Sequence, residues 1–276
     1  MTVSAEKRDS RLKGPMEGVR VIELGQLLAG PFAGSRLADF GAEVIKVETP
    51  VKGDPMREWG HHRWEGHAMW WPVLARNKKS VTANLREKRG QDLIRELIVD
   101  ADVLIENFKP GTLEKWGLGP EELHKINPGL VIARISGFGQ TGPYRDRVAV
   151  DPTIQALSGI MSVTGEPDGE RMQLGAPLAD AMSGMYAAYA IVGALHGVGD
   201  SGEGRFIDIS MQDVMLAALG TRIVETLSAG VLPERSGNSN PNRVPAGVYR
   251  TSDGERINII CMNDRFWGAL CAAIDR

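Results

Sequence analysis

The stretch Val19-Arg20-Val21-Ile22-Glu23-Leu24 begins the pattern that decides the fold, because this apolar, partly β-branched run before a glycine is typical of a buried strand. A helix is predicted next, over residues 32–40, with Ala29-Gly30-Pro31 at its start and Gly41 at its end. Residues 43–48 form a second apolar run. A strand, a helix and a strand within about thirty residues predict a right-handed crossover between parallel strands.

The same alternation continues along the chain. Further strands are predicted over residues 80–85, 103–106, 130–135 and 205–210, and further helices over residues 89–99, 121–127, 152–162, 179–196 and 211–228. This order is typical of an α/β fold, a doubly wound, mainly parallel Rossmann-like sheet. Residues 49–79 interrupt it with four of the six tryptophans, and we expect a functional loop there.

Four segments follow from the pattern. Residues 1–16 are polar and are expected to form a flexible arm, and residues 17–229 form the large Rossmann-like domain with its long helix. Residues 230–246, rich in Pro, Asn, Ser and Arg, are expected to be a linker. Residues 247–276 predict a hairpin and a helix, the beginning of a small α+β domain that is truncated at the end of the chain.

Composition restricts the class of protein. The chain has 276 residues, 42% hydrophobic and 24% charged, with a net charge of −3, which is ordinary for a soluble globular protein and gives no electrostatic reason to expect nucleic acid. We find no signal peptide and no run of about 18 apolar residues, so no membrane partner is expected. Cys261 and Cys271 fit neither a disulfide framework nor a metal site. The expectation is a cytoplasmic protein with reduced thiols and no metal.

Asp180 is the acidic residue of most interest. Residues 174–178 are turn-forming and deliver Asp180 to the start of an apolar, small-residue helix. One interpretation is a simple helix N-cap. The other is a nucleophile, its carboxylate kept ionised by the free N–H groups and the helix dipole. The sequence has no G-x-S-x-G elbow, no phosphate-loop lysine and no metal-ligand histidine spacing, so Asp180 has few rivals.

Two other patterns have competing interpretations. Residues 137–142 match G-x-G-x-x-G, but the residues after Gly142 predict a loop where a dinucleotide site needs a helix, so we expect no nucleotide redox cofactor. Several basic residues could be solvated surface charges or a rim that binds phosphates. These residues are Arg76, Lys78, Lys79, Arg86, Lys109 and Lys115.

Taken in order, the motifs strongly resemble the class III CoA-transferases, the group of formyl-CoA transferase, carnitine CoA-transferase and bile-acid-inducible CoA-transferase. The resemblance extends from about residue 17 to the end of the chain. The motifs that carry it are Val21-Ile22-Glu23-Leu24, Ala29-Gly30-Pro31, residues 37–48, Gly53-Asp54-Pro55, Arg76-Asn77-Lys78-Lys79-Ser80, residues 101–108, Gly137-Phe138-Gly139 and Ala179-Asp180.

The resemblance implies an acyl-CoA:carboxylate CoA-transferase in which Asp180 attacks the thioester and passes through anhydride and aspartyl-CoA stages. It implies acyl-CoA and a small carboxylic acid as substrates, no nucleic-acid partner, and a homodimer of interlocked ring-shaped subunits. By position, the implied CoA contacts are Leu28, Ala29, Ala83, Asn84, Leu85, Arg86, Asn107, Phe108, Lys109, Lys115, Ser136 and Gly137. Family chains are longer, so we expect a fragment or a short form.

Two alternatives remain. The α-methylacyl-CoA racemases of the same superfamily carry a His as second acid–base group just before the Asp that corresponds to Asp151, and here that position is Val150. Since proton removal and return on opposite faces of a carbon need two such groups, Val150 favours a transferase over a racemase. The other alternative is a truncated CoA-binding protein without catalysis.

Overall fold

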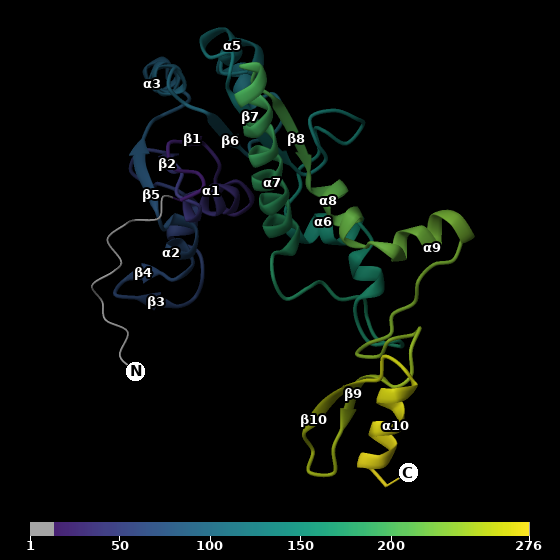
Figure 1. Ribbon diagram of the computed structural model, residues 1–276. Helices are drawn as coiled ribbons and strands as arrows, with labels where there is room; N and C mark the ends of the chain where they lie inside the picture. The colour runs from purple at the N-terminus through teal and green to yellow at the C-terminus, as the bar shows by residue number, and fades with distance from the viewer. Residues whose placement is uncertain (1–13, 276) are drawn as a thin grey trace. The chain divides into compact units, whose positions relative to one another are not determined.

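The computed structural model describes residues 14–275, so most of the predicted N-terminal arm, residues 1–13, lies outside the described residues (Figure 1). Its centre is a six-stranded sheet in the order β5-β2-β1-β6-β7-β8. The strands are β1 (Arg20–Glu23), β2 (Glu43–Glu48), β5 (Lys78–Thr82), β6 (Val103–Glu106), β7 (Val131–Ser136) and β8 (Phe206–Ser210). All neighbouring strands pair in parallel, which confirms the predicted sheet.

Helices cover both faces of this sheet. On one face, Ile22, Leu104 and Ile132 lie side by side on β1, β6 and β7 and are fully buried with side chains of α3 (Lys88–Ile98) and α5 (Pro120–Ile126). On the other face, α1 (Ala29–Asp39) packs on β1, β2 and β6, and α7 (Leu178–Ser201) packs on α1, β7 and β8 (Figure 1). The fold is therefore doubly wound, as predicted.

The predicted loop over residues 49–79 contains short elements. They are η2 (Pro55–Arg57), β3 (Arg63–Trp64), β4 (His67–Ala68) and α2 (Trp70–Ala75). The strand expected at residues 80–85 begins two residues earlier, so Lys78 and Lys79 belong to β5. A short helix, α4 (Thr112–Lys115), was not predicted because four residues show no helical period.

Two predicted helices are divided by glycines with positive φ. The helix expected over residues 211–228 is in fact α8 (Met211–Ala218) and α9 (Thr221–Ala229), separated at Gly220, whose φ is 55°. The helix expected over residues 152–162 is α6 (Asp151–Leu157) and the 3-10 turn η3 (Ile160–Val163), separated at Gly159 with φ 86°. In both cases apolar residues continue past the break, which hid it from a pattern analysis.

The chain divides into two compact units. Among the described residues, one unit comprises residues 14–154 and 177–217 and holds the large sheet, and the other comprises residues 155–176 and 218–275. The second unit contains the antiparallel hairpin of β9 (Ala246–Arg250) and β10 (Arg256–Ile260), followed by α10 (Asp264–Ala273). The segment limits at residues 229 and 246 stay a prediction.

Helix α7 is long and apolar. Its span Leu178–Gly199 has a mean hydropathy of 1.3 and, by length and composition only, could cross a membrane; it is the one helix among residues 14–275 with this property. The expectation that no stretch is long and apolar enough to span a membrane is therefore wrong as a statement about length and composition. Core helices of globular proteins meet the same criterion, and α7 packs against α1 and two strands of the sheet.

Candidate active site

The predicted CoA contacts follow the carboxyl ends of four parallel strands. Leu28 and Ala29 follow β1, residues 83–86 follow β5, residues 107–109 follow β6, and Ser136 and Gly137 end β7, while Lys115 ends α4. From β5 to β7 there are four strand spacings of about 4.8 Å each, a span of roughly 19 Å suited to an extended cofactor. The strand order reverses between β1 and β6, and open α/β sheets bind ligands outside the carboxyl ends at such a point.

Asn107 joins the two loops at this reversal. Its side-chain oxygen accepts a hydrogen bond from the Gln26 N–H at 2.8 Å, and its amide nitrogen donates to the Gln26 carbonyl at 2.9 Å. The loop after β6 thus holds the loop after β1 by both backbone groups of one residue. The Asn107 side chain is engaged within the chain at this position.

Asp180 is the third residue of α7. Pro177 occupies the N-cap position without a side-chain cap, so the interpretation of Asp180 as N-cap is wrong. The backbone N–H of Asp180 instead donates to Oδ2 of Asp151 at 3.1 Å. That carboxylate comes from the start of α6, and it supplies the acceptor that a helix terminus needs.

The ionisation of Asp180 also differs from expectation. Burial first, and the negative charge of Asp151 second, raise the pKa of the Asp180 carboxyl to about 7. The expectation is that the helix terminus keeps this carboxylate ionised, whereas a pKa of about 7 leaves it only partly ionised at neutral pH. A carboxyl that titrates near neutrality is a frequent feature of functional sites.

Helix α7 brings Asp180 close to the start of α1. A Cβ atom placed on Gly184 would lie 2.6 Å from the carbonyl oxygen of Ala29, so the two helix backbones nearly touch there. Asp180 precedes Gly184 by four residues, about 6 Å along the same helix face. The candidate nucleophile therefore lies about one turn along α7 from the point where this helix meets Ala29, a predicted CoA contact.

A second route connects Asp180 with the end of β7. A Cβ atom on Gly137 would lie 2.2 Å from the Cβ of Ala149, so the loop after β7 folds back onto its own beginning. The next two residues are Val150, which is exposed, and Asp151, which is buried and holds the Asp180 backbone. No helix begins directly after the G-x-G-x-x-G match, since α6 starts only at Asp151.

Three of the six basic residues proposed for a phosphate rim are engaged in ion pairs within the chain. Lys78 is buried against Glu23, and Arg76 and Lys79 form ion pairs with Asp39 and Glu43. The other three, Arg86, Lys109 and Lys115, are exposed, and within residues 14–275 their side chains form no ion pair. These three remain candidates for contacts to phosphate.

A buried charged network beside the loop after β1 was missed. Lys46 and Glu23 form an ion pair of 3.0 Å, and the side chain of neither is more than 2% exposed. The only sequence signal was a charged residue within each of two apolar strands. Among residues 14–275, His, Cys, Asp and Glu side chains form no group that could hold a metal ion.

Known proteins similar to this chain were compared with it. The profile of CoA-transferase family III matches residues 16–276. The chain is 49% identical over 260 residues to succinyl-CoA–D-citramalate CoA-transferase of Chloroflexus aurantiacus, covering 94% of this chain and 65% of that protein. It is 44% identical to succinate–glutarate CoA-transferase of Agrobacterium fabrum, covering 94% and 66%. The chain thus spans just under two thirds of the length of these relatives.

A solved structure is also similar. The crystal structure of a CAIB/BAIF family protein from Brucella suis superposes with a TM-score of 0.87 at 42% identity, covering 95% of this chain and 70% of that one. The likeness extends over both compact units, since nearly the whole chain is covered.

Proposed function

The chain belongs to CoA-transferase family III, and we propose that it transfers CoA between an acyl-CoA thioester and a free carboxylate with Asp180 as the nucleophile. The observation that carries this proposal is the Asp180 carboxyl, which has a pKa of about 7 and lies about one turn along α7 from the contact of Gly184 with Ala29. Val150 supports transfer over racemisation, because a valine cannot act as the second acid–base group.

The chemistry requires only carboxylates and thiolate. Ionised Asp180 attacks the thioester carbonyl, the C–S bond breaks, and CoA leaves as a thiolate while a mixed anhydride forms. The thiolate then attacks the Asp180 carbonyl, which releases the first acid and leaves an aspartyl-CoA thioester. An incoming carboxylate repeats the two steps in reverse order, forming the new acyl-CoA and restoring Asp180.

We further propose dicarboxylates as the first substrates to assay, because relatives are named for succinate, glutarate and citramalate. A succinyl-CoA donor with a panel of four- and five-carbon dicarboxylate acceptors tests this choice. The implied homodimer is tested separately, by measuring the mass of the protein in solution.

The Asp180→Asn variant tests the nucleophile. We expect loss of CoA exchange by at least a thousandfold and loss of the hydroxylamine-trapped aspartyl intermediate, because an amide is not a carboxylate nucleophile. Asp213→Asn is the matched control, since Asp213 is also the third residue of its helix, α8, and is exposed. Near-normal exchange in Asp180→Asn would rule out this role.

A further inference from the structure

The loop of residues 25–28, between β1 and α1, is fixed at three consecutive residues by side chains from elsewhere in the chain. The carbonyl of Gly25 accepts a hydrogen bond from Lys46 Nζ at 2.8 Å. The next residue is held by the Asn107 amide described above. The N–H of Leu27 donates to Oδ1 of Asp54 at 3.2 Å.

The backbone of Leu27 explains why such fixing is needed. Its φ of 61° lies in the left-handed region, which residues other than glycine rarely adopt. A strained conformation of this kind persists where surrounding contacts determine it, and such positions cluster at ligand sites. Leu28 and Ala29, the predicted CoA contacts, follow directly.

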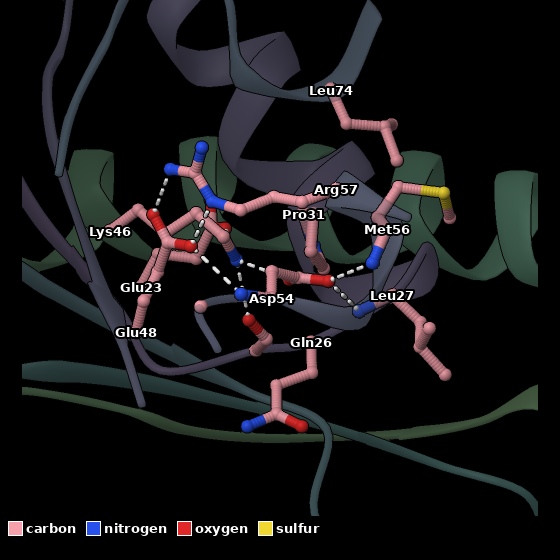
Figure 2. Close-up of polar contacts among 12 residues, drawn as sticks. Glu23, Gln26, Leu27, Pro31, Lys46, Glu48, Asp54, Met56, Arg57 and Leu74 are labelled. Carbon is pink, nitrogen blue, oxygen red and sulfur yellow. Dashed lines mark hydrogen bonds and ion pairs between the residues drawn. The ribbon is translucent and has the colours of Figure 1, made fainter. Parts of the chain in front are cut away.

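Asp54 connects the loop to a buried network of charged side chains (Figure 2). Its Oδ2 lies 2.8 Å from Lys46 Nζ, and the two side chains are 1% and 2% exposed. Lys46 also contacts Glu23, which in turn contacts Lys78 at 2.6 Å. Two buried acids and two buried bases therefore balance each other, and removing one would leave an uncompensated charge.

Asp54 is itself held in place by hydrogen bonds to residues outside the loop. Its N–H donates to Oε2 of Glu48 at 2.8 Å, and its Oδ1 also accepts the N–H of Met56 at 2.8 Å (Figure 2). Glu48 is held by Arg57 through two hydrogen bonds of 2.7 and 2.8 Å. Within this network Asp54 has a direct contact to the loop, whereas Glu48 shows none.

We propose that Asp54, with its charge balanced by Lys46, is a positioning residue for the acyl-CoA, which fixes residues 25–28 so that Leu28 and Ala29 present a preset backbone to the cofactor. This inference rests on the proposed function, because it concerns the same CoA site. It differs from a purely structural role in one respect: loss of Asp54 should weaken CoA binding by more than it weakens folding.

The pair Asp54→Asn and Glu48→Gln separates these two roles. The two oxygens of Asp54 face different partners, Oδ1 the N–H groups of Leu27 and Met56 and Oδ2 the Lys46 ammonium, so in Asn the amide NH2 must face one of these donors. Gln at position 48 disturbs an equally buried part of the network without touching the loop. Each full-length variant is titrated with CoA by calorimetry, and its unfolding midpoint is measured alongside. We expect Asp54→Asn to bind CoA at least tenfold more weakly, and Glu48→Gln within twofold of the native chain.

Equal weakening in both variants, in step with their loss of stability, would overturn the positioning role, as would native-like CoA binding by Asp54→Asn. Hydrogen exchange on the native chain covers the case in which a variant does not fold. We expect the amides of Gln26 and Leu27 to be as protected without CoA as the sheet amides. Protection that arises only when CoA binds would contradict a preset loop.

Failure of the proposed function gives a different result. If the native chain neither bound CoA nor catalysed CoA transfer, the proposed function would be wrong, and Asp54 could not position CoA. Hydrogen exchange measured without CoA would still show whether the network fixes the loop of residues 25–28.

Discussion

At the scale of single residues, Asp180 combines two properties that oppose each other. Burial and Asp151 favour its neutral form, whereas attack on a thioester requires the ionised form. A carboxylate with a raised pKa is also a stronger nucleophile once ionised, because it is more basic. A pKa of about 7 leaves a substantial ionised fraction at neutral pH together with this higher basicity.

The rate of CoA transfer should therefore rise with pH. Below about pH 7 we expect kcat/KM to increase close to tenfold for each pH unit, and above it to level off, in a pH–rate profile of the native protein. Asp151→Asn removes the neighbouring negative charge, so its rising limb should move to lower pH. A profile that is flat between pH 5 and 8 would contradict this assignment.

The same shift determines a stability effect. Because the pKa of Asp180 is higher in the folded than in the unfolded chain, its contribution is complete below its ordinary pKa of 3.8 and is lost as pH rises toward about 7. Asn at position 180 should therefore raise the unfolding midpoint at pH 8 and leave it nearly unchanged at pH 3. Unfolding curves of native chain and variant at both pH values check this.

At the scale of elements, the contact between α1 and α7 brings the predicted cofactor loop and the candidate nucleophile together. It depends on Gly184, where even one methyl group would collide with the Ala29 carbonyl. The sheet alone would not achieve this, because α7 follows β7 only after a long excursion through residues 137–177.

Gly184→Ala should lower stability by about 1–3 kcal/mol, because an extra methyl in a packed contact forces the helices apart. Gly193→Ala is the matched control on the same helix: its Cβ would meet no atom within 4 Å, so alanine should stabilise by roughly 0.5–1 kcal/mol. Denaturant unfolding of the two variants measures both. An equal change in stability in the two variants would contradict the close contact between Gly184 and Ala29.

Helices and strands could be predicted from the sequence where a local pattern specifies them, and not where they depend on distant residues or on a single backbone angle. Most strands of the large sheet contain a local apolar run, so the pattern predicts them, whereas β5 begins with two lysines that the pattern left outside the strand. The break at Gly220 depends on one backbone angle, and apolar residues continue on both sides of it. The raised pKa of Asp180 depends first on its burial and then on Asp151, 29 residues away. The buried pair of Lys46 and Asp54 depends on a loop path that no local pattern encodes.

At the scale of the whole molecule, two groups of basic residues matter, buried ones that are paired with acids and exposed ones that, among the described residues, are not. The net charge is −3, yet Arg86, Lys109 and Lys115 are exposed near the carboxyl edge of the sheet without ion pairs among residues 14–275. The buried cations Lys46 and Lys78 are neutralised by acids within the fold. The three exposed residues, which lie in loops or at the end of the short helix α4, are the positive charges that we expect a phosphate-bearing ligand to meet.

CoA affinity should consequently fall as salt rises, because exposed charges are screened. Lys109→Gln should weaken CoA binding by about threefold or more at low salt and less at 0.5 M salt. The control is Lys125→Gln, because Lys125 forms an ion pair with Glu122 within α5. The end of α5 leads into the start of β7, so Lys125 lies toward the amino ends of the strands, away from the predicted CoA contacts. Calorimetric titrations with CoA at two salt concentrations compare the two variants. CoA binding that does not depend on salt would contradict a role for Lys109 in binding phosphate.

The near contact of Gly137 with Ala149 limits how the protein can be redesigned. Residue 137 leaves no room for a side chain, whereas Val150, the residue directly after Ala149, is exposed. A library aimed at the proposed acid substrates can therefore vary position 150 while keeping glycine at 137. Introducing His at Val150 is then the shortest route by which this scaffold could acquire a second proton-transfer group.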